Sequence, residues 1–236
     1  MPRFLNTATG QFVIKSLPVE YAILSHTWRS EDEGGEQTYR DIREIQENFC
    51  KIAHDAGYDL AWLDTCCIDQ TSSAELSEAI NSMYAWYQQA AVCYVYLCDV
   101  SGDDPEPMIS QFRESRWHRR GWTLQELIAP TRVIFLTKTW ESFGTKSTHI
   151  WTLAEITGIR ASILAGRQGV EEASVAERMS WAARRRTTRI EDEAYSLLGL
   201  FGLYMSPIYG EGANAFIRLQ EQIVRNVPDL SIFAWG

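Results

Sequence analysis

The segment that says most about possible chemistry is residues 115–130, which read SRWHRRGWTLQELIAP. If this segment is helical, Trp122 and Glu126 lie one turn apart, so that a carboxylate stands beside an aromatic ring. Arg120 and two further arginines add positive charge immediately upstream. An aromatic plate, a carboxylate and guanidinium groups together suit a planar ligand that carries phosphates and some positive charge. The competing interpretation is a surface glutamate that pairs with an arginine, with the tryptophans used only for packing.

Polar residues also follow two apolar runs of strand length. Residues 21–25 lead into the first cluster and residues 60–64 into the second. In an open parallel sheet, ligands bind beyond the carboxyl ends of the strands. Either cluster alone could be a capped strand end, but two clusters at the same edge favour a site. The candidates for this pocket are Ser25, His26, Thr27, Trp28, Asp64 and Cys67.

Other kinds of site are disfavoured by their missing motifs. The chain has no GxGxxG and no GxxxxGK[ST] phosphate-binding loop. Its five cysteines include no CxxC pair, which argues against both a disulfide framework and a zinc knuckle. Metal ligation around His26 and Asp64 matches no standard spacing, so we expect no metal and no bound cofactor. A Cys67–His26 nucleophile pair is a weak third possibility, because free cysteines at strand ends usually act as small apolar residues.

Composition narrows the class of protein further. The 236 residues include 31 acidic and 22 basic side chains, giving a net charge of −9. This balance argues against nonspecific nucleic-acid binding, which depends on Lys and Arg. The longest apolar run, residues 90–97, is far shorter than the roughly 18 residues of a membrane helix. The amino terminus has no apolar signal core, so a cytoplasmic location is predicted.

The elements that must position these residues follow an alternating order. Apolar runs of strand length at 21–25, 60–64, 92–97 and 133–136 are separated by stretches with helical periodicity. Strands separated by helices imply right-handed βαβ crossovers and a parallel sheet. Capping pairs are expected to open two of the helices, at Thr38/Asp41 and Ser72/Glu75.

The last third of the chain is mainly helical in pattern. Capping boxes at Ser174/Glu177 and Thr188/Glu191 predict two helices, and a last strand is expected over 231–235. No linker of Pro, Ser and Gly divides this part from the rest. We therefore expect a single domain over 1–236, with an α/β core over 1–140 and a helical extension over 141–236. The arginine-rich residues 184–189 are either a second anion-binding patch or a solvated helix end.

Several blocks resemble the fungal heterokaryon-incompatibility (HET) domain. Its three hallmark blocks are matched by YAILSHTW at 21–28, WLDTCCID at 62–69 and RGWTLQEL at 120–127. The downstream pattern is matched by ERMSWA, TTRIED, AYSLLG and YGEG, which begin at residues 177, 187, 194 and 209. The resemblance covers residues 21–235. It implies a module that triggers cell death in fungal non-self recognition, fused to or activated by a receptor-like sensor.

A more distant resemblance concerns mechanism. Residues 115–127 are similar to the Ser-x-Trp-Cys-x-x-Glu-Leu segment of Toll/interleukin-receptor (TIR) domains, with Thr123 in place of the Cys. The order of strands and helices before this segment also agrees, which implies a flavodoxin/TIR-like sheet. In TIR domains that hydrolyse NAD+, the glutamate matching Glu126 is catalytic. The helical extension has no TIR counterpart, so the far wall of the pocket is not predicted.

The resemblance therefore implies an NAD+ glycohydrolase that uses NAD+ as substrate and needs no cofactor. Glu126 is expected to be catalytic and Trp122 to stack on the base, with Arg120 facing the phosphates. Self-association into oligomers is also implied. The alternative is a non-enzymatic, self-associating signalling module that recruits other death effectors. A scaffold has no need of a carboxylate beside a tryptophan in a strand-end cleft, and this favours the enzyme.

Overall fold

A single sheet forms the centre of the protein. The computed structural model describes residues 2–27, 39–102 and 105–233. Within these ranges seven strands pair in the order β2-β1-β4-β3-β5-β6-β7. Their bounds are β1 (Arg3–Asn6), β2 (Phe12–Ile14), β3 (Ala22–Ser25), β4 (Leu60–Trp62), β5 (Val92–Tyr96), β6 (Val133–Leu136) and β7 (Ser142–Thr145).

The four predicted strands are confirmed and lie side by side at the middle of the sheet. β3 pairs in parallel with both β4 and β5, and β5 pairs in parallel with β6. In chain order their arrangement is 2-1-3-4, the order of flavodoxin-like doubly wound sheets. The outer strands β1, β2 and β7, of which β2 and β7 are the edges, pair antiparallel and were not predicted. None of the three contains four consecutive apolar residues, whereas each predicted strand lies in an apolar run of at least that length.

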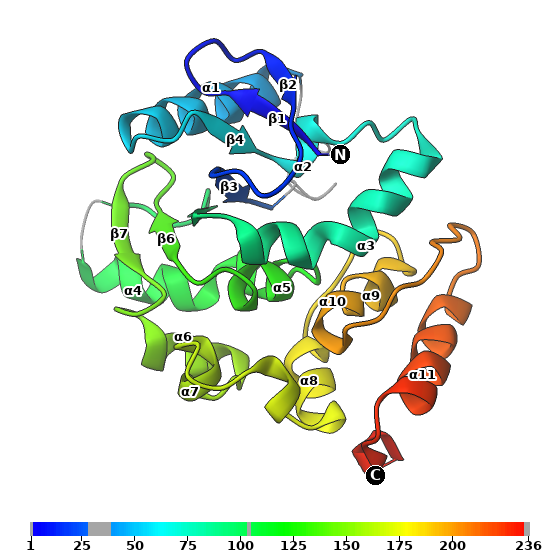
Figure 1. The fold of residues 1–236 in the computed structure, drawn as a ribbon. Coiled ribbons are helices and arrows are strands. Elements are labelled where there is room, and N and C mark those ends of the chain that lie inside the picture. Colours follow the sequence, from blue (N-terminus) through cyan, green and yellow to red (C-terminus); the bar gives the residue numbers. More distant parts are fainter. Residues whose placement is uncertain (1, 28–38, 103–104, 234–236) are drawn as a thin grey trace.

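Helices cover both faces of the sheet (Figure 1). α1 (Tyr39–Asp55) lies on one face, and α3 (Ser73–Gln89) and α5 (Thr123–Ile128) lie on the other. Opposite faces are expected, because right-handed crossovers run in opposite directions from β3 to β4 and from β4 to β5. The remaining elements of this part are α2 (Asp64–Cys67), α4 (Pro105–Glu114) and η2 (Arg116–Arg119).

The C-terminal part is helical and packs against α3 (Figure 1). The helix α10 (Leu198–Phe201) approaches α3 so closely that a Cβ atom at Gly199 would lie 2.1 Å from Cβ of Tyr84. The Asn81 side chain on α3 also accepts a bond from N and donates one to O of Met205, both at 2.9 Å. The elements are α6 (Ile150–Thr157), α7 (Ala161–Leu164), η3 (Val170–Glu172), α8 (Val175–Ala182), α9 (Asp192–Tyr195), α10 (Leu198–Phe201), α11 (Asn214–Asn226) and η4 (Leu230–Phe233).

The predicted helix starts have mixed outcomes. Ser174 and Glu177 form the full capping box of α8, as predicted. Ser72 caps α3, but the Glu75 carboxylate accepts a bond from N of Asp69 at 2.8 Å. The box at Thr188/Glu191 is wrong, because the Glu191 carboxylate binds backbone N–H groups of the 210–212 loop.

Two further predictions concern the last strand and the start of α1. The strand expected over 231–235 is wrong, since η4 occupies its described part. Thr38 lies outside the described residues. In the part of the chain that the structure describes, no helix combines the length and the apolar character needed to cross a membrane.

Candidate active site

A cavity of about 310 Å³ lies between the sheet and the C-terminal helices. It opens where β3 ends, next to β5, which is the point where the strand order reverses and where ligands of doubly wound sheets bind. Five residues singled out in the sequence line it, namely His26, Asp64, Arg120, Trp122 and Glu126. Apolar side chains of α3 form another part of the wall (Leu76, Ile80 and Met83).

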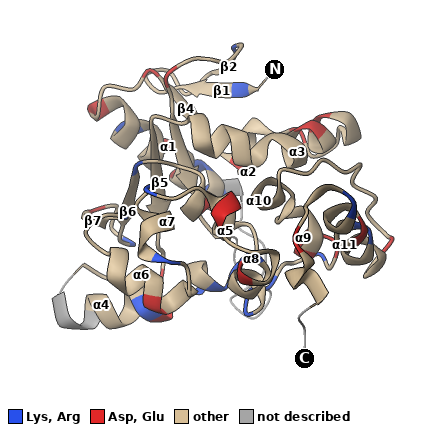
Figure 2. Cartoon of the chain, turned by 60° about the horizontal axis from the view of Figure 1, so that its bottom comes forward, with Lys and Arg blue, Asp and Glu red and all other residues tan. Residues whose placement is uncertain are grey.

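Glu126 is the buried acid of this cavity. Its residue surface is 7% exposed, and Figure 2 shows its helix, α5, near the centre of the molecule. The carboxylate accepts a hydrogen bond from Oγ of Ser25, and Ser25 Oγ in turn accepts one from Nε1 of Trp117 at 2.7 Å. The interpretation of Glu126 as a surface ion-pair partner is therefore wrong.

The protonation of Glu126 reflects this burial. Desolvation, with a contribution from the charge of Asp64, raises the pKa of Glu126 to about 8. The bond from Ser25 and the charges of Arg120 and Arg185 act in the opposite direction. Burial with specific charged neighbours in a cleft is typical of functional acids.

The helix that carries Glu126 is fixed at both ends. At its start, Oγ1 of Thr123 donates to O of Trp117 at 2.5 Å. At its end, the buried Lys146 ammonium donates to O of Leu127 at 3.1 Å and to O of Pro130. Charge at a helix C-terminus and bonds to its last carbonyls both stabilise that end. A six-residue helix is too short to be stable alone, so these contacts hold the acid in place.

His26 and Asp64 lie beside the acid. Nε2 of His26 and Oδ1 of Asp64 are 3.5 Å apart, and the His26 side chain is 1% exposed. Asp64 does not extend a strand, as the sequence suggested, but begins the short helix α2. Because the chain turns there, its carboxylate faces the cavity that Glu126 also lines.

The far wall comes from the C-terminal part, and the sequence did not reveal it. It consists of Thr188, Arg189, Asp192 and Tyr209. The Arg189 guanidinium lies 4.3 Å from the ring centre of Tyr209, and Oη of Tyr209 donates to Oδ1 of Asp192 at 2.9 Å. Nη2 of Arg120 donates to Oγ1 of Thr188 at 3.0 Å. The two walls are thus joined by a direct contact.

One carboxylate arranges this wall. Oε1 of Glu191 accepts hydrogen bonds from N of Gly210 at 2.8 Å and N of Gly212 at 3.1 Å. These bonds tie the loop that carries Tyr209 to the segment that carries Arg189. Two signals for this wall were present in the sequence: the TTRIED and YGEG blocks belong to the HET pattern, and residues 184–189 were a candidate anion-binding patch. Neither signal gave these residues a position in space.

The other predicted site residues lie elsewhere. Ser25 does not line the cavity, but its hydroxyl donates a hydrogen bond to the Glu126 carboxylate. Thr27 is buried and accepts a bond from Nε of Arg116 at 3.1 Å, so it is not a lining residue. Cys67 is 2% exposed and accepts a bond from N of Leu63, which places it in the core and gives no support to a cysteine nucleophile. Trp28 lies outside the described residues.

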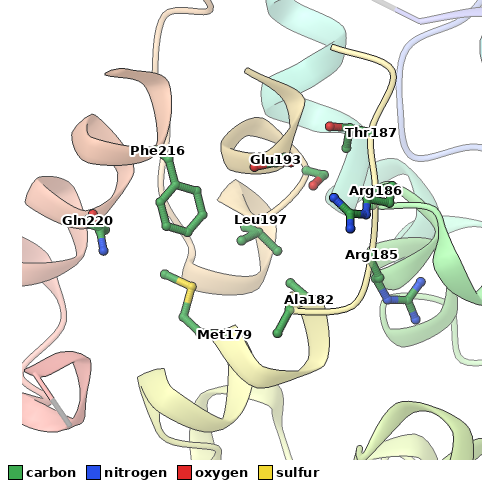
Figure 3. Close-up of a pocket in the computed structure, with 12 residues that line it drawn as sticks. Met179, Ala182, Arg185, Arg186, Thr187, Glu193, Leu197, Phe216 and Gln220 are labelled. Atoms are coloured by element: carbon green, nitrogen blue, oxygen red, sulfur yellow. The ribbon is translucent and has the colours of Figure 1, made fainter. Parts of the chain in front are cut away.

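Residues 184–189 do not form one solvated helix end. Arg185 is buried and, with Arg186 and Thr187, lines a second cavity of about 400 Å³ (Figure 3), whereas Thr188 and Arg189 line the site cavity. Figure 3 shows Phe216 and Met179 on one side of that cavity and Arg186 and Thr187 on the other. Among the described residues, no group of three or more His, Cys, Asp and Glu side chains is arranged to hold a metal ion.

Known proteins resemble this chain in the following ways. Residues 21–108 match the family described as "Heterokaryon incompatibility protein (HET)". Residues 214–236 match a family described as a domain of unknown function (DUF8212). The chain is 43% identical over 219 residues to the vegetative incompatibility protein HET-E-1 of Podospora anserina. That match covers 86% of this chain but 16% of the relative, so the chain spans about one sixth of the relative's length.

The chain therefore belongs to the heterokaryon-incompatibility (HET) family, as its sequence blocks indicated. No solved structure matches the chain significantly, so the likeness to TIR domains stays a prediction.

Proposed function

We propose that this domain hydrolyses NAD+ at the N-glycosidic bond of nicotinamide. The observation that carries the proposal is the position of Glu126, a desolvated carboxylate held by Ser25 at the wall of a cavity. The same cavity presents the Trp122 side chain and two arginines, Arg120 and Arg189. Planar aromatic groups suit a base, and guanidinium groups suit phosphates, which together match the parts of a dinucleotide.

The reaction needs little from the protein besides positioning and charge. The bond between C1′ of the ribose and N1 of nicotinamide breaks, and its electron pair leaves with nicotinamide, which becomes neutral. Positive charge then develops on the ribose, as in glycoside hydrolysis, and water adds at C1′ with release of a proton. A carboxylate at the position of Glu126 stabilises that charge, most strongly where water is excluded. The leaving group is already cationic, so neither a metal nor a strong general acid is required.

The biological consequence we infer is cell death through loss of NAD+ during fungal non-self recognition. The named relative is a vegetative incompatibility protein, which agrees with this role. We further infer that residues 1–236 act as one domain in the cytoplasm, under the control of a receptor-like sensor. A direct test is release of nicotinamide from NAD+ by the purified domain.

The pH dependence of turnover should follow Glu126. Since the reaction requires the ionised carboxylate, kcat/KM should rise with pH and level off above the pKa of Glu126, which is about 8. The midpoint of the kcat profile should lie at a lower pH than that of kcat/KM, because the positive charge of bound nicotinamide favours the ionised carboxylate. Initial rates of nicotinamide release from pH 5.5 to 9.5 measure both. A kcat/KM that is constant or falls over this range would contradict the role of Glu126.

Activity should also depend on self-association, which the resemblance to TIR domains implies. Fusion to an oligomerising module is expected to raise the rate per molecule severalfold at low protein concentration, since tethering raises the effective concentration of the domain. The matched control is the same fusion carrying Glu126→Gln. A rate per molecule that stays constant on dilution and on clustering would show that the isolated subunit is complete.

A further inference from the structure

Arg185 belongs to the C-terminal part but contacts the segment that leads into the helix of Glu126. It lies just after α8 and is 8% exposed. The residue that follows it is bound to the core by two backbone hydrogen bonds, from N of Gly121 to O of Arg186 at 2.8 Å and from N of Arg186 to O of Arg119 at 2.6 Å. In Figure 3 the Arg185 side chain lies across the cavity from Phe216.

The Arg185 guanidinium binds the first turn of α5 directly. Nη1 donates to O of Arg120 and to Oγ1 of Thr123, both at 2.9 Å, and Nε donates to O of Trp181 at 3.2 Å. Thr123 is in turn bound to O of Trp117, the residue whose indole N–H holds Ser25. Hydrogen bonds through Thr123 and Trp117 therefore connect Arg185 to Ser25, which binds Glu126.

The charge of Arg185 also acts on Glu126, and because Arg185 is buried, solvent screens this interaction only weakly. The titratable or charged groups of the core around Glu126 are Asp64 from α2, Tyr87 from α3, Cys93 from β5, His26 after β3, Arg120 before α5 and Lys146 after β7. The far wall of the cavity adds Arg189, Asp192 and Tyr209. Burial raises the pKa values of Tyr87 and Cys93, so both are neutral near pH 7. Asp64 opposes ionisation of Glu126, and Arg120 and Arg185 favour it. A buried charge is screened less than one in contact with solvent.

We propose that Arg185 is a positioning residue for Glu126, which fixes the turn that begins α5 and supplies a buried positive charge that favours the ionised carboxylate. The inference rests on the proposed function, because it gives Glu126 a partner in the C-terminal part. It also assigns a reason for the helical extension, which adds a buried cation to the one that Arg120 of the α/β core supplies.

The test compares Arg185→Gln with Arg185→Lys and with Arg178→Gln. Arg178 is a matched control, since it is 5% exposed, belongs to the helix that precedes Arg185, and donates to O of Leu200 at 3.0 Å away from the site. For Arg185→Gln, the rise in kcat/KM should move to higher pH by about one unit, with roughly tenfold lower activity at pH 7, because a nearby opposite charge shifts a carboxyl pKa by this order. KM on the alkaline plateau should stay unchanged, since Arg185 does not line the site cavity.

The two other variants separate charge from structure. Arg185→Lys should restore most of the pH profile, and Arg178→Gln should lower thermal stability while leaving the profile in place. A folded Arg185→Gln protein with the parental profile, or an equal displacement in Arg178→Gln, would overturn the inference. If Arg185→Gln does not fold, Thr123→Val replaces it: kcat should fall at unchanged pH dependence, and an unchanged kcat would overturn the positioning role.

Failure of the proposed function is distinguishable from failure of this inference. A parent protein that releases no nicotinamide contradicts the proposed function alone. The carboxyl carbon of Glu126 can then be titrated by NMR in protein labelled with ¹³C-glutamate. A higher titration midpoint in Arg185→Gln than in the parent supports the inference, and equal midpoints overturn it.

Discussion

Glu126→Gln is expected to lower the rate of nicotinamide release by a few hundred-fold or more while the protein stays folded. Gln is nearly isosteric with Glu, and its amide oxygen can still accept the hydrogen bond from Ser25. The substitution removes the negative charge that stabilises the developing positive charge on the ribose. Loss of one such group commonly costs about 3–4 kcal/mol of transition-state stabilisation. Steady-state rates with NAD+, measured on proteins of matching circular dichroism, give the ratio.

The matched control for this variant is Glu44→Gln. Glu44 lies on α1 and is exposed, so the same change of charge occurs away from the site. Cell killing on expression should be lost with Glu126→Gln and kept with Glu44→Gln. Killing by folded Glu126→Gln, in cells where the parent protein causes no loss of NAD+, would instead support the non-enzymatic signalling module.

The same substitution should stabilise the protein at alkaline pH. Burial raises the pKa of Glu126 from its ordinary value of 4.5 to about 8, so between these values the folded state holds a proton that the unfolded state has lost. The free energy of unfolding of the parent therefore falls as pH rises through this range. The full difference is on the order of 3–5 kcal/mol above pH 8. The amide introduced by Glu126→Gln cannot ionise, so the variant avoids this loss.

Thermal melting of both proteins between pH 4 and 9 measures the effect. We expect the two melting temperatures to converge near pH 4.5 and the variant to melt at the higher temperature above pH 7. Melting curves that shift in parallel over the whole range would show that Glu126 ionises as freely in the folded protein as in the unfolded one.

The core side of the site could be predicted from the sequence because a general rule covers it. Parallel strands bring their carboxyl ends to one edge, so Ser25, His26 and Asp64 were expected together, and the helical spacing of Trp122 and Glu126 placed them beside this edge. The rule fails where the chain turns early. α2 begins at Asp64, so the chain folds back and Cys67 accepts a bond from N of Leu63 in the core.

The other wall depends on contacts that periodicity does not encode. Arg189 and Tyr209 reach the cavity because the C-terminal helices dock on α3, through the close approach at Gly199 and the bonds between Asn81 and Met205. Such contacts join residues more than 100 positions apart. Likewise, Glu191 reads as a helix-capping residue in sequence, and only the position of the 210–212 loop shows its actual partners.

The most direct test of the central claim is a side-by-side incubation of the clustered parent and clustered Glu126→Gln proteins with NAD+, with the products resolved by chromatography. The account predicts equimolar nicotinamide and ADP-ribose, linear or cyclised, from the parent and almost none from the variant. No nicotinamide from the clustered parent, or equal release from both proteins, would contradict it.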